Sequence, residues 1–593
     1  MGLIGWIHHA RDLSDEHRTI ITMTTALGIC EMPADSVRLA RHAAFGHCHP
    51  RTGYADWRHP EHPDPDLSVV VDGQLSNRTH LEHQLFERPR PLASDADLLL
   101  HAYRAWGAGL ADRIDGSYAI AIWDNRARQL VLMRDAIGAK TLFYAQRGDG
   151  VVFASTVTAL LAHPEVEPIV DADGLNELLA LGPVRTPGHG VIRDVAEVLP
   201  GELVRTTPAG VRRRRYFSFE ADVHHHSLTE TVATIHDLLA ARTEHLRAHP
   251  ADAVLLSGGV ASAAAGAMTA GPGDQQRSVW TLISGGSTPL KPNKVPHLRA
   301  ASLAASHLRL RHHLLIAGWL GLPRAPAAAR AALDLPGEPA IDAPLVALLD
   351  RIAATGAESI VTGDGAATVF GSYRWLRQPS SPATADFPWR PYGLAATDLL
   401  NAETRARLRP DRYRLRRYDQ ATATVPHLSG AGMLGRQQRI KTHLALTHYL
   451  PRLLVRLDQL AGAAGLAVQT PMADWLLASY LYNIPNYLRH PRGVANGLLL
   501  RAVADLVPAP ITWLKPLPFP AMPNMAAWHR TQHLRLLELI RDKDTPLASL
   551  LDAQRVADAL TMPAVARGPY RHSPITHVLE VAEWLERHHI TLT

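Results

Sequence analysis

The chain has 593 residues, more than one hydrophobic core usually organises, so at least two domains are expected. The 61 Lys and Arg against 56 Asp and Glu give a formal charge of +5, and no zinc-finger, RNP-type or basic-zipper signature accompanies them, so nucleic-acid binding is not expected. No stretch approaches the ~20 uninterrupted apolar residues of a membrane span, and the N-terminus lacks a basic segment followed by an apolar one, so we expect a cytoplasmic protein.

The first 220 residues are predicted to be rich in β-structure. Short apolar runs between Asp, Gly and Asn turns predict strands at residues 67–71, 118–123, 129–133 and 151–153. Helical patterns interrupt them at residues 94–106, with an N-cap at Ser94, and at residues 173–181. The two cysteines, Cys30 and Cys48, form no CxxC pair and predict no disulfide framework. We expect an α+β domain over residues 1–220, with one sheet packed on another and flanking helices.

Two polar segments lie near the end of this domain. The basic run at residues 212–215 is most simply interpreted as a solvated strand end or hairpin. The three adjacent histidines at residues 224–226 point in different directions along any regular backbone, which favours a polar linker over a metal site. We therefore expect the domain boundary here, and a second domain over residues 227–593.

Two glycine loops follow strands in the second domain, which is otherwise rich in Ala- and Leu-containing helical segments. A buried-type strand at 253–256 runs into Ser257-Gly258-Gly259, and a second at 359–361 runs into residues 362–365. Strand, glycine loop and helix form the unit of a parallel α/β sheet, whose ligands lie beyond the carboxyl ends of the strands. Free backbone N–H groups, a small hydroxyl and a helix N-terminus suit phosphate, with a plain tight turn as the alternative. We expect one crevice shared by both loops.

With the residues around them, these loops resemble the asparagine synthetase superfamily, whose synthetase domain carries loops of the forms SGGxDS and SGxGADE. The resemblance covers nearly the whole chain. In the N-terminal part it rests on Gly2 to Trp6, Gly73, Asn77, Ser94-Asp95, Asp115-Gly116, Trp123-Asp124, Arg134-Asp135, Gly138, Lys140 and Phe153 to Ser155. In the C-terminal part it rests on Tyr449-Leu450-Pro451, Asp458, Pro471, Asp474, Arg501 and Lys515.

The resemblance implies a fold and a reaction. The fold is an Ntn-hydrolase-like β-sandwich domain, related to glutamine amidotransferases, followed by an α/β domain of the adenine nucleotide α-hydrolase type with a parallel sheet and many helices. In active relatives ATP activates a carboxylate as an acyl-adenylate, an amine attacks it, and Mg²⁺ bridges the departing pyrophosphate. ATP and Mg²⁺ are therefore the implied cofactors.

The resemblance also assigns site residues. Lys515 would be catalytic and stabilise the charged intermediate, with a snorkelling surface lysine as the alternative. Nucleotide contacts or loop walls are implied for Ser257, Gly258, Gly259, Ser262, Gly363, Asp364, Gly365 and Arg501. For Arg501 the alternative is an ordinary salt bridge on a helix face.

The metal-binding acids of the family are missing. They correspond to Ala261 in the first loop, Ala367 and Thr368 in the second, and a position near His297 or Leu298. Asp364 and Glu338 are nearby acids that could take over magnesium binding, although an acid in a glycine turn is more often a turn former. The glutamate that β-lactam-forming relatives use as a base corresponds to Ala467. No metal ligand is therefore assigned.

The N-terminal domain has lost its nucleophile. Members that use glutamine have a cysteine after the initiator methionine, where this chain has Gly2, and the residues that hold glutamine correspond to Cys48, Asp72 and Gln74. Glutaminase activity is not expected, and the domain is interpreted as a retained scaffold. A missing cysteine is the pattern of β-lactam and carbapenam synthetases and lasso-peptide cyclases, which take their amine from the substrate itself.

The chain is most similar to the lasso-peptide cyclases, through Gly5-Trp6, Arg11-Asp12-Leu13 and residues 458–461. That similarity implies an ATP-dependent ligase that activates an Asp or Glu side chain of a ribosomal precursor peptide and closes a macrolactam with the peptide N-terminus. A leader-binding protein and a leader peptidase are the implied partners. The alternatives are a pseudoenzyme that binds peptide, nucleotide or a sister subunit without turnover, and a homologue repurposed for chemistry without an adenylate.

Overall fold

The computed structural model describes residues 2–28, 36–48, 66–88, 92, 94–269, 277–284, 296–317, 325–378, 386–390, 393–513, 525–542, 545–562 and 573–593. The chain divides into two compact units. Unit 1 is Met1–Gly174, Pro187–Ser218 and Leu454–Ala467, and unit 2 is Leu175–Thr186, Phe219–Leu453 and Val468–Thr593. A single boundary at residues 220–227 does not describe this division. Segment 175–186 precedes that boundary but belongs to unit 2, and segment 454–467 follows it but belongs to unit 1.

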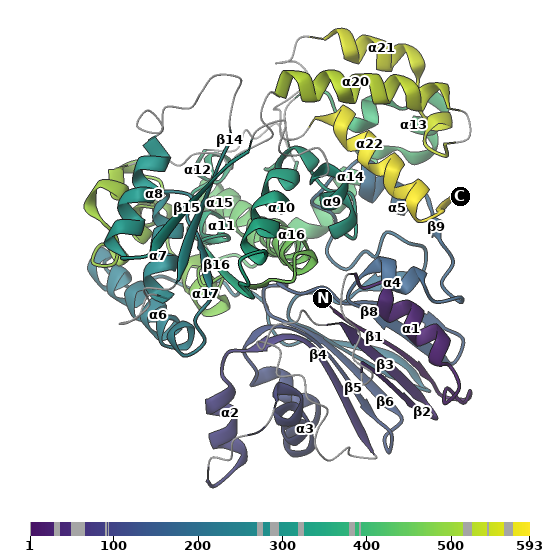
Figure 1. Ribbon diagram of the computed structural model, residues 1–593, viewed down its shortest axis with the longest axis horizontal. Helices are drawn as coiled ribbons and strands as arrows, with labels where there is room; N and C mark the ends of the chain where they lie inside the picture. Colours follow the sequence, from purple (N-terminus) through teal and green to yellow (C-terminus); the bar gives the residue numbers. More distant parts are fainter. Residues whose placement is uncertain are drawn as a thin grey trace. The chain divides into compact units, whose positions relative to one another are not determined.

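Two antiparallel sheets form unit 1 (Figure 1). One has the order β10-β7-β8-β1-β3-β2, with bounds β10 Val195–Glu197, β7 Phe143–Arg147, β8 Gly150–Ala154, β1 Gly2–His8, β3 Ala43–Cys48 and β2 Val37–Ala40. The other has the order β12-β11-β6-β5-β4, with bounds β12 Gly210–Arg215, β11 Glu202–Thr207, β6 Gln129–Arg134, β5 Gly116–Asp124 and β4 Leu67–Leu75. All four strands expected from the apolar runs are present.

The two sheets pack face to face. Leu3 and Phe153 of the first sheet share one core with Val70 and Leu132 of the second. Helix α3 (Asp95–Trp106) covers the other face of the second sheet, and the Ser94 hydroxyl accepts a hydrogen bond from the Asp97 N–H at 3.2 Å, as its N-cap position predicted. The predicted α+β class, with sheet on sheet and flanking helices, is confirmed. The smaller helices of unit 1 are α1 (His17–Thr25), α2 (Arg78–Leu85) and α4 (Val157–Leu161).

Residues 212–215 lie in β12, an edge strand with four exposed arginines, so the interpretation as a solvated strand end or hairpin is confirmed.

Cys48, at the end of β3, is disulfide-bonded, and its partner lies outside the described residues. The expectation of no disulfide framework was wrong, because the lack of a CxxC pair does not exclude a bond between cysteines at a longer spacing.

A largely parallel sheet forms the centre of unit 2, in the order β15-β14-β13-β16-β17. The bounds are β15 Arg311–Ala317, β14 Ser278–Ser284, β13 Ala253–Leu255, β16 Ser359–Thr362 and β17 Ala467–Gln469. β13 pairs in parallel with both β14 and β16, and β14 pairs in parallel with β15. Chain order proceeds from β13 to β15 on one side and resumes at β16 on the other, so the topological switch point lies between β13 and β16.

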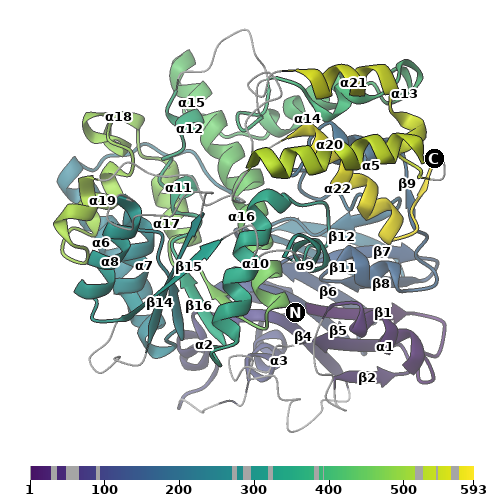
Figure 2. The ribbon, with the colours of Figure 1, turned by 45° about the horizontal axis from the view of Figure 1, so that its top comes forward.

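Helices cover this sheet and extend beyond it. Figures 1 and 2 show α7 (Val260–Thr269) and α8 (Pro296–His307) on one side of the sheet and α10 (Pro339–Ala353) on the other. Near the C-terminus, α20 (Met525–Arg541) packs against α22 (Pro574–Arg587), with α21 (Ala553–Thr561) beside them. No helix in the described part of the chain is both long and apolar enough to cross a membrane.

Candidate functional site

The two predicted glycine loops lie side by side at the switch point of the parallel sheet. Leu255 of β13 is in register with Thr362 of β16, so the loops leave neighbouring strands at the same edge. Gly363 touches the first loop so closely that a Cβ there would lie 2.5 Å from the Ser262 nitrogen. Only glycine fits at that position. The two loops thus lie together, as the sequence predicted, at the edge where open α/β sheets bind their ligands.

The first loop is closed by its two serines. The Ser262 hydroxyl accepts a hydrogen bond from the Ser257 N–H at 3.1 Å and donates to the Gly259 carbonyl at 3.0 Å. Gly258 has a φ of +82°, and a Cβ there would lie 2.2 Å from the His297 carbonyl oxygen. Helix α7 starts at Val260, so the loop leads directly into a helix N-terminus, which favours a bound anion. These features suit a nucleotide phosphate.

The second loop is a tight turn that Asp364 helps to form. The Thr362 hydroxyl donates to the Asp364 carboxylate at 2.6 Å and accepts from the Asp364 N–H at 3.3 Å. Gly365 has a φ of +87°, and its missing Cβ leaves room for Ala473, whose Cβ would be 2.7 Å away. Asp364 is exposed. Its contacts fit the turn-forming interpretation.

The residues of the crevice do not fit a protein-held Mg²⁺ ion. Ala261 and Ala367 are half-buried and offer no oxygen, and the Thr368 hydroxyl is buried. Asp364 is the one carboxylate in the two loops. Within the described residues, no group of three or more His, Cys, Asp or Glu side chains could hold a metal ion. Because Mg²⁺ needs hard oxygen ligands, we derive no step that depends on a metal held by this chain.

The two basic residues that the sequence suggested for the site are Arg501 and Lys515. Arg501 is exposed near the end of α19 (Gly497–Ala502), a short helix that packs against α7. Arg501 forms no ion pair with any residue that the structure describes, so the salt-bridge alternative is not supported there. Lys515 lies outside the described residues.

The position of the lost nucleophile in unit 1 is filled by other side chains. Gly2 begins β1, and a Cβ there would lie 2.8 Å from the Ser155 Cβ and 2.9 Å from a Leu27 methyl. The Ser155 hydroxyl accepts a hydrogen bond from the Leu3 N–H at 3.0 Å and donates to the Asp72 carboxylate at 3.2 Å. The glutamine site has therefore changed beyond the loss of one side chain.

Next to Ser155 lies a buried charge cluster that the sequence did not reveal. The Lys140 ammonium lies 3.1 Å from Asp72 and 2.8 Å from Asp458. Burial alone lowers the pKa of Lys140, but the carboxylates of Asp458 and Asp72 outweigh it and raise the pKa above its ordinary value. Lys140 therefore stays protonated and cannot serve Ser155 as a base. Lys140 and Asp458 matched the superfamily separately, but they are 318 residues apart, and nothing in the sequence indicated their contact.

The two antiparallel sheets of unit 1 and the parallel sheet of unit 2 are those of a two-domain, amidotransferase-like ligase family. The sequence-family model of the glutamine amidotransferase domain matches residues 1–217, and the sequence-family model of asparagine synthase matches residues 234–586. The chain belongs to the asparagine synthase family.

Two relatives match all or most of the chain at low identity. The asparagine synthetase [glutamine-hydrolyzing] 3 of Bacillus subtilis is 26% identical over 632 residues, covering 100% of this chain and 99% of the relative. A putative asparagine synthetase of Mycobacterium bovis is 26% identical over 519 residues, covering 78% of this chain and 76% of the relative. The match to a solved glutamine phosphoribosylpyrophosphate amidotransferase from B. subtilis is 15% identical and covers 53% of this chain and 65% of that one, with a TM-score of 0.26.

Proposed function

We propose that this chain is an ATP-dependent amide-forming ligase that takes its amine from its own substrate and not from glutamine. One observation carries the proposal. The side-chain position of Gly2, where a glutamine-using relative would need its nucleophile, is occupied by Ser155 and Leu27, while the phosphate-type loop at residues 257–262 keeps its geometry. Ammonia from glutamine is then not the amine donor, although the ligase crevice is retained.

The proposed reaction has two steps. A substrate carboxylate oxygen attacks the α-phosphorus of ATP, which forms an acyl-adenylate as the bond to pyrophosphate breaks. An amine of the same substrate then attacks the acyl carbon, AMP leaves with the electron pair of the broken C–O bond, and the amine loses a proton to solvent. In these steps the backbone N–H groups around Gly258 and Gly259 and the N-terminus of α7 hold phosphate. The exposed Asp364 carboxylate lies on the opposite wall.

The proposed product of this reaction is a macrolactam. The carboxylate would belong to an Asp or Glu side chain of a ribosomal precursor peptide, and the amine to the N-terminus of that peptide. A leader peptidase would free this amine, and a leader-binding protein would deliver the peptide. The similarity of residues 5–6, 11–13 and 458–461 to lasso-peptide cyclases supports this assignment.

The test is a reaction with a candidate precursor encoded beside the gene for this chain. Purified protein, ATP and Mg²⁺ are mixed with the leader-free peptide, pyrophosphate release is measured, and the peptide is weighed by mass spectrometry. We expect pyrophosphate and a product lighter by one water. Absence of both with a range of neighbouring peptides would overturn the proposal, whereas ammonia release from glutamine would return the chain to the glutamine-using group.

A second candidate function is supported by the missing acids. With Ala261 and Ala367 in place of carboxylates, a homologue that binds nucleotide or peptide without turnover is the alternative. It predicts that ATP affinity is independent of Mg²⁺, which isothermal titration calorimetry measures directly. Strong magnesium-dependent affinity in the unmodified chain would exclude it.

A further inference from the structure

An apolar cavity of about 100 Å³ lies wholly within unit 2. Its walls come from residues 179–184, the start of α10, the described residues between 389 and 396, Tyr449 and the start of α22. Leu181, Ala340 and Trp389 represent its apolar lining, and Glu338, Arg390 and His577 are its ionisable residues. Glu338, one of the acids that the sequence offered for magnesium, thus lies in this wall as the residue that begins α10.

One wall is fixed by a buried carboxylate. Glu177 is fully buried in α5 (Ala172–Leu179) and accepts hydrogen bonds from the Tyr413 hydroxyl at 2.6 Å and the Thr186 N–H at 2.8 Å. Arg417 lies 3.2 Å from the same carboxylate. These contacts hold both ends of segment 179–184, and the Arg452 guanidinium donates to the Pro183 carbonyl at 2.8 Å within it. The wall is preformed.

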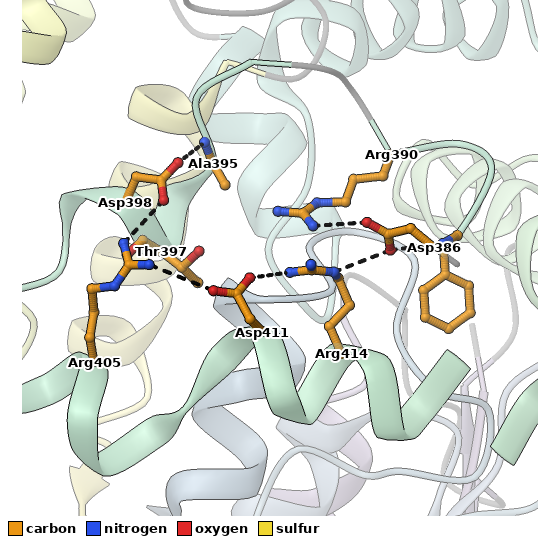
Figure 3. A network of polar contacts seen from close by, with 9 residues as sticks. Asp386, Arg390, Ala395, Thr397, Asp398, Arg405, Asp411 and Arg414 are labelled. Carbon is orange, nitrogen blue, oxygen red and sulfur yellow. Dashed lines mark hydrogen bonds and ion pairs between the residues drawn. The ribbon is translucent and has the colours of Figure 1, made fainter. Parts of the chain in front are cut away.

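The facing wall is fixed by the ion-pair network in Figure 3. Asp386 pairs with Arg390 at 3.0 Å and with Arg414 at 3.2 Å, and Arg414 continues to Asp411 at 2.7 Å. The Ala395 N–H donates to Asp398 at 2.9 Å, which holds the other side of this wall. Because Arg390 is already neutralised by Asp386, it does not make the cavity a site for anions. The lining is mostly apolar and carries the Glu338 carboxylate, so it favours an apolar group and disfavours an anion.

A tyrosine pair connects the cavity with the second glycine loop. Tyr449, in the cavity wall, packs edge-on against Tyr373 with ring centroids 5.4 Å apart. Leu450, the residue after Tyr449, lies against the loop itself, because a Cβ added at Gly365 would be 3.3 Å from a Leu450 methyl. The cavity wall and the second glycine loop are therefore in contact through neighbouring residues.

We propose that the cavity receives a branched aliphatic side chain of the peptide substrate, close in the sequence to the residue that forms the amide. The size supports this class, since a dry cavity of about 150 Å³ holds benzene and this one is smaller. The proposal rests on the proposed ligase function for its substrate, but the cavity can be tested without turnover.

The first test is binding of a model residue to the full-length protein. Saturation-transfer NMR, without ATP, is recorded with N-acetyl-leucinamide, N-acetylglycinamide and isobutanol. We expect the leucine methyls to receive saturation, no signal from the glycine compound, and weaker binding of isobutanol by about tenfold or more because it lacks the peptide groups. If N-acetylglycinamide bound as well as N-acetyl-leucinamide, the cavity would not recognise the aliphatic side chain, and the proposal would be overturned. Equal binding of isobutanol would show a site for free apolar molecules and overturn the peptide assignment.

The second test fills the cavity. Ala340→Leu places an isobutyl group in the lining and should weaken N-acetyl-leucinamide binding by about tenfold or more. Ala353→Leu, at the far end of the same helix, is the matched control and should leave binding unchanged. If Ala340→Leu does not fold, Trp389→Ala replaces it. We expect the enlarged cavity of this variant to bind N-acetyl-tryptophanamide and the unmodified protein to reject it. Unchanged binding in the variant used overturns the proposal. If leucinamide binds as expected while the ligase test fails, only the proposed reaction falls.

Discussion

Gly2 shows at the level of one residue why an ancestral activity cannot be restored by one substitution. A cysteine Cβ at this position would lie under 3 Å from Ser155 and Leu27, so the side chain must displace both. We expect Gly2→Cys to release no ammonia from glutamine and to destabilise the protein by about 1–3 kcal/mol through overpacking. A glutaminase assay and a urea titration measure both effects, with removal of Met1 checked by mass spectrometry. Glutamine hydrolysis by the single variant would show that the site is still functional.

The Lys140 cluster predicts a pH-dependent stability. Lys140→Met leaves the buried Asp72 and the partly buried Asp458 without their cation, which should cost about 3 kcal/mol near neutral pH. Without the ammonium, the pKa values of these carboxyls rise, and the folded state gains stability from proton uptake as pH falls below them. The loss should therefore shrink toward about pH 5. Urea midpoints at the two pH values test this.

A matched control for this cluster is Arg193→Met. Arg193 pairs with Glu167 at 2.6 Å, but both side chains are well exposed, so the loss should stay below about 1 kcal/mol. A pH-independent loss in Lys140→Met would contradict the charge argument and leave only lost packing.

The two alanines of the crevice can be tested by returning carboxylates to them. In Ala261→Asp with Ala367→Asp, two carboxylates on adjacent loops provide the hard oxygen ligands that Mg²⁺ prefers. We expect the ATP affinity of the double variant to rise at least about tenfold on adding Mg²⁺, measured by calorimetry. Ala331→Asp, on an exposed helix position, serves as the charge control. No magnesium effect would mean that the crevice has diverged beyond its missing acids.

At the level of elements, Glu177 is the residue through which α5 and α14 (Pro410–Ala423) are joined. Glu177→Gln keeps the shape but leaves Arg417 without its buried partner, so we expect a loss of about 3 kcal/mol. Hydrogen exchange at residues 179–186 should accelerate because both ends of the segment depend on this carboxylate. Asp419→Asn, exposed on α14, is the control. Unchanged hydrogen exchange at these residues in Glu177→Gln would show that this carboxylate does not hold the cavity wall in place.

The elements that the sequence predicted correctly are those specified locally. The hydroxyl of Ser94 caps the start of α3. The runs at 118–123 and 129–133 form strands because they are apolar throughout, and alternate residues fill the cores on the two faces of the sheet. The crevice followed from two strand–glycine units. The Lys140–Asp458 contact and the contacts of Glu177 with Tyr413 and Arg417 could not be predicted, because each depends on which distant segments the tertiary fold brings together.

At the level of the whole molecule, the two units exchange segments, and neither can be cut free at one boundary. A fragment of residues 1–220 lacks segment 454–467, which leaves Lys140 without Asp458. A fragment of residues 227–593 lacks segment 175–186, which leaves Tyr413 and Arg417 without Glu177. We expect both fragments to melt at lower temperature and less cooperatively than the full chain, as calorimetry would show. Native-like melting of either fragment would contradict this.

The arginines of β12 have a consequence for how copies of this chain behave in a crowded solution. β12 ends its sheet, so one side of its backbone offers unpaired hydrogen-bonding groups to any passing strand. Arg214 is paired with Asp112, but Arg212, Arg213 and Arg215 still carry positive charge that repels an identical strand, most strongly at low ionic strength. We therefore expect the basic run to hinder edge-to-edge self-association, a role that requires no ligand.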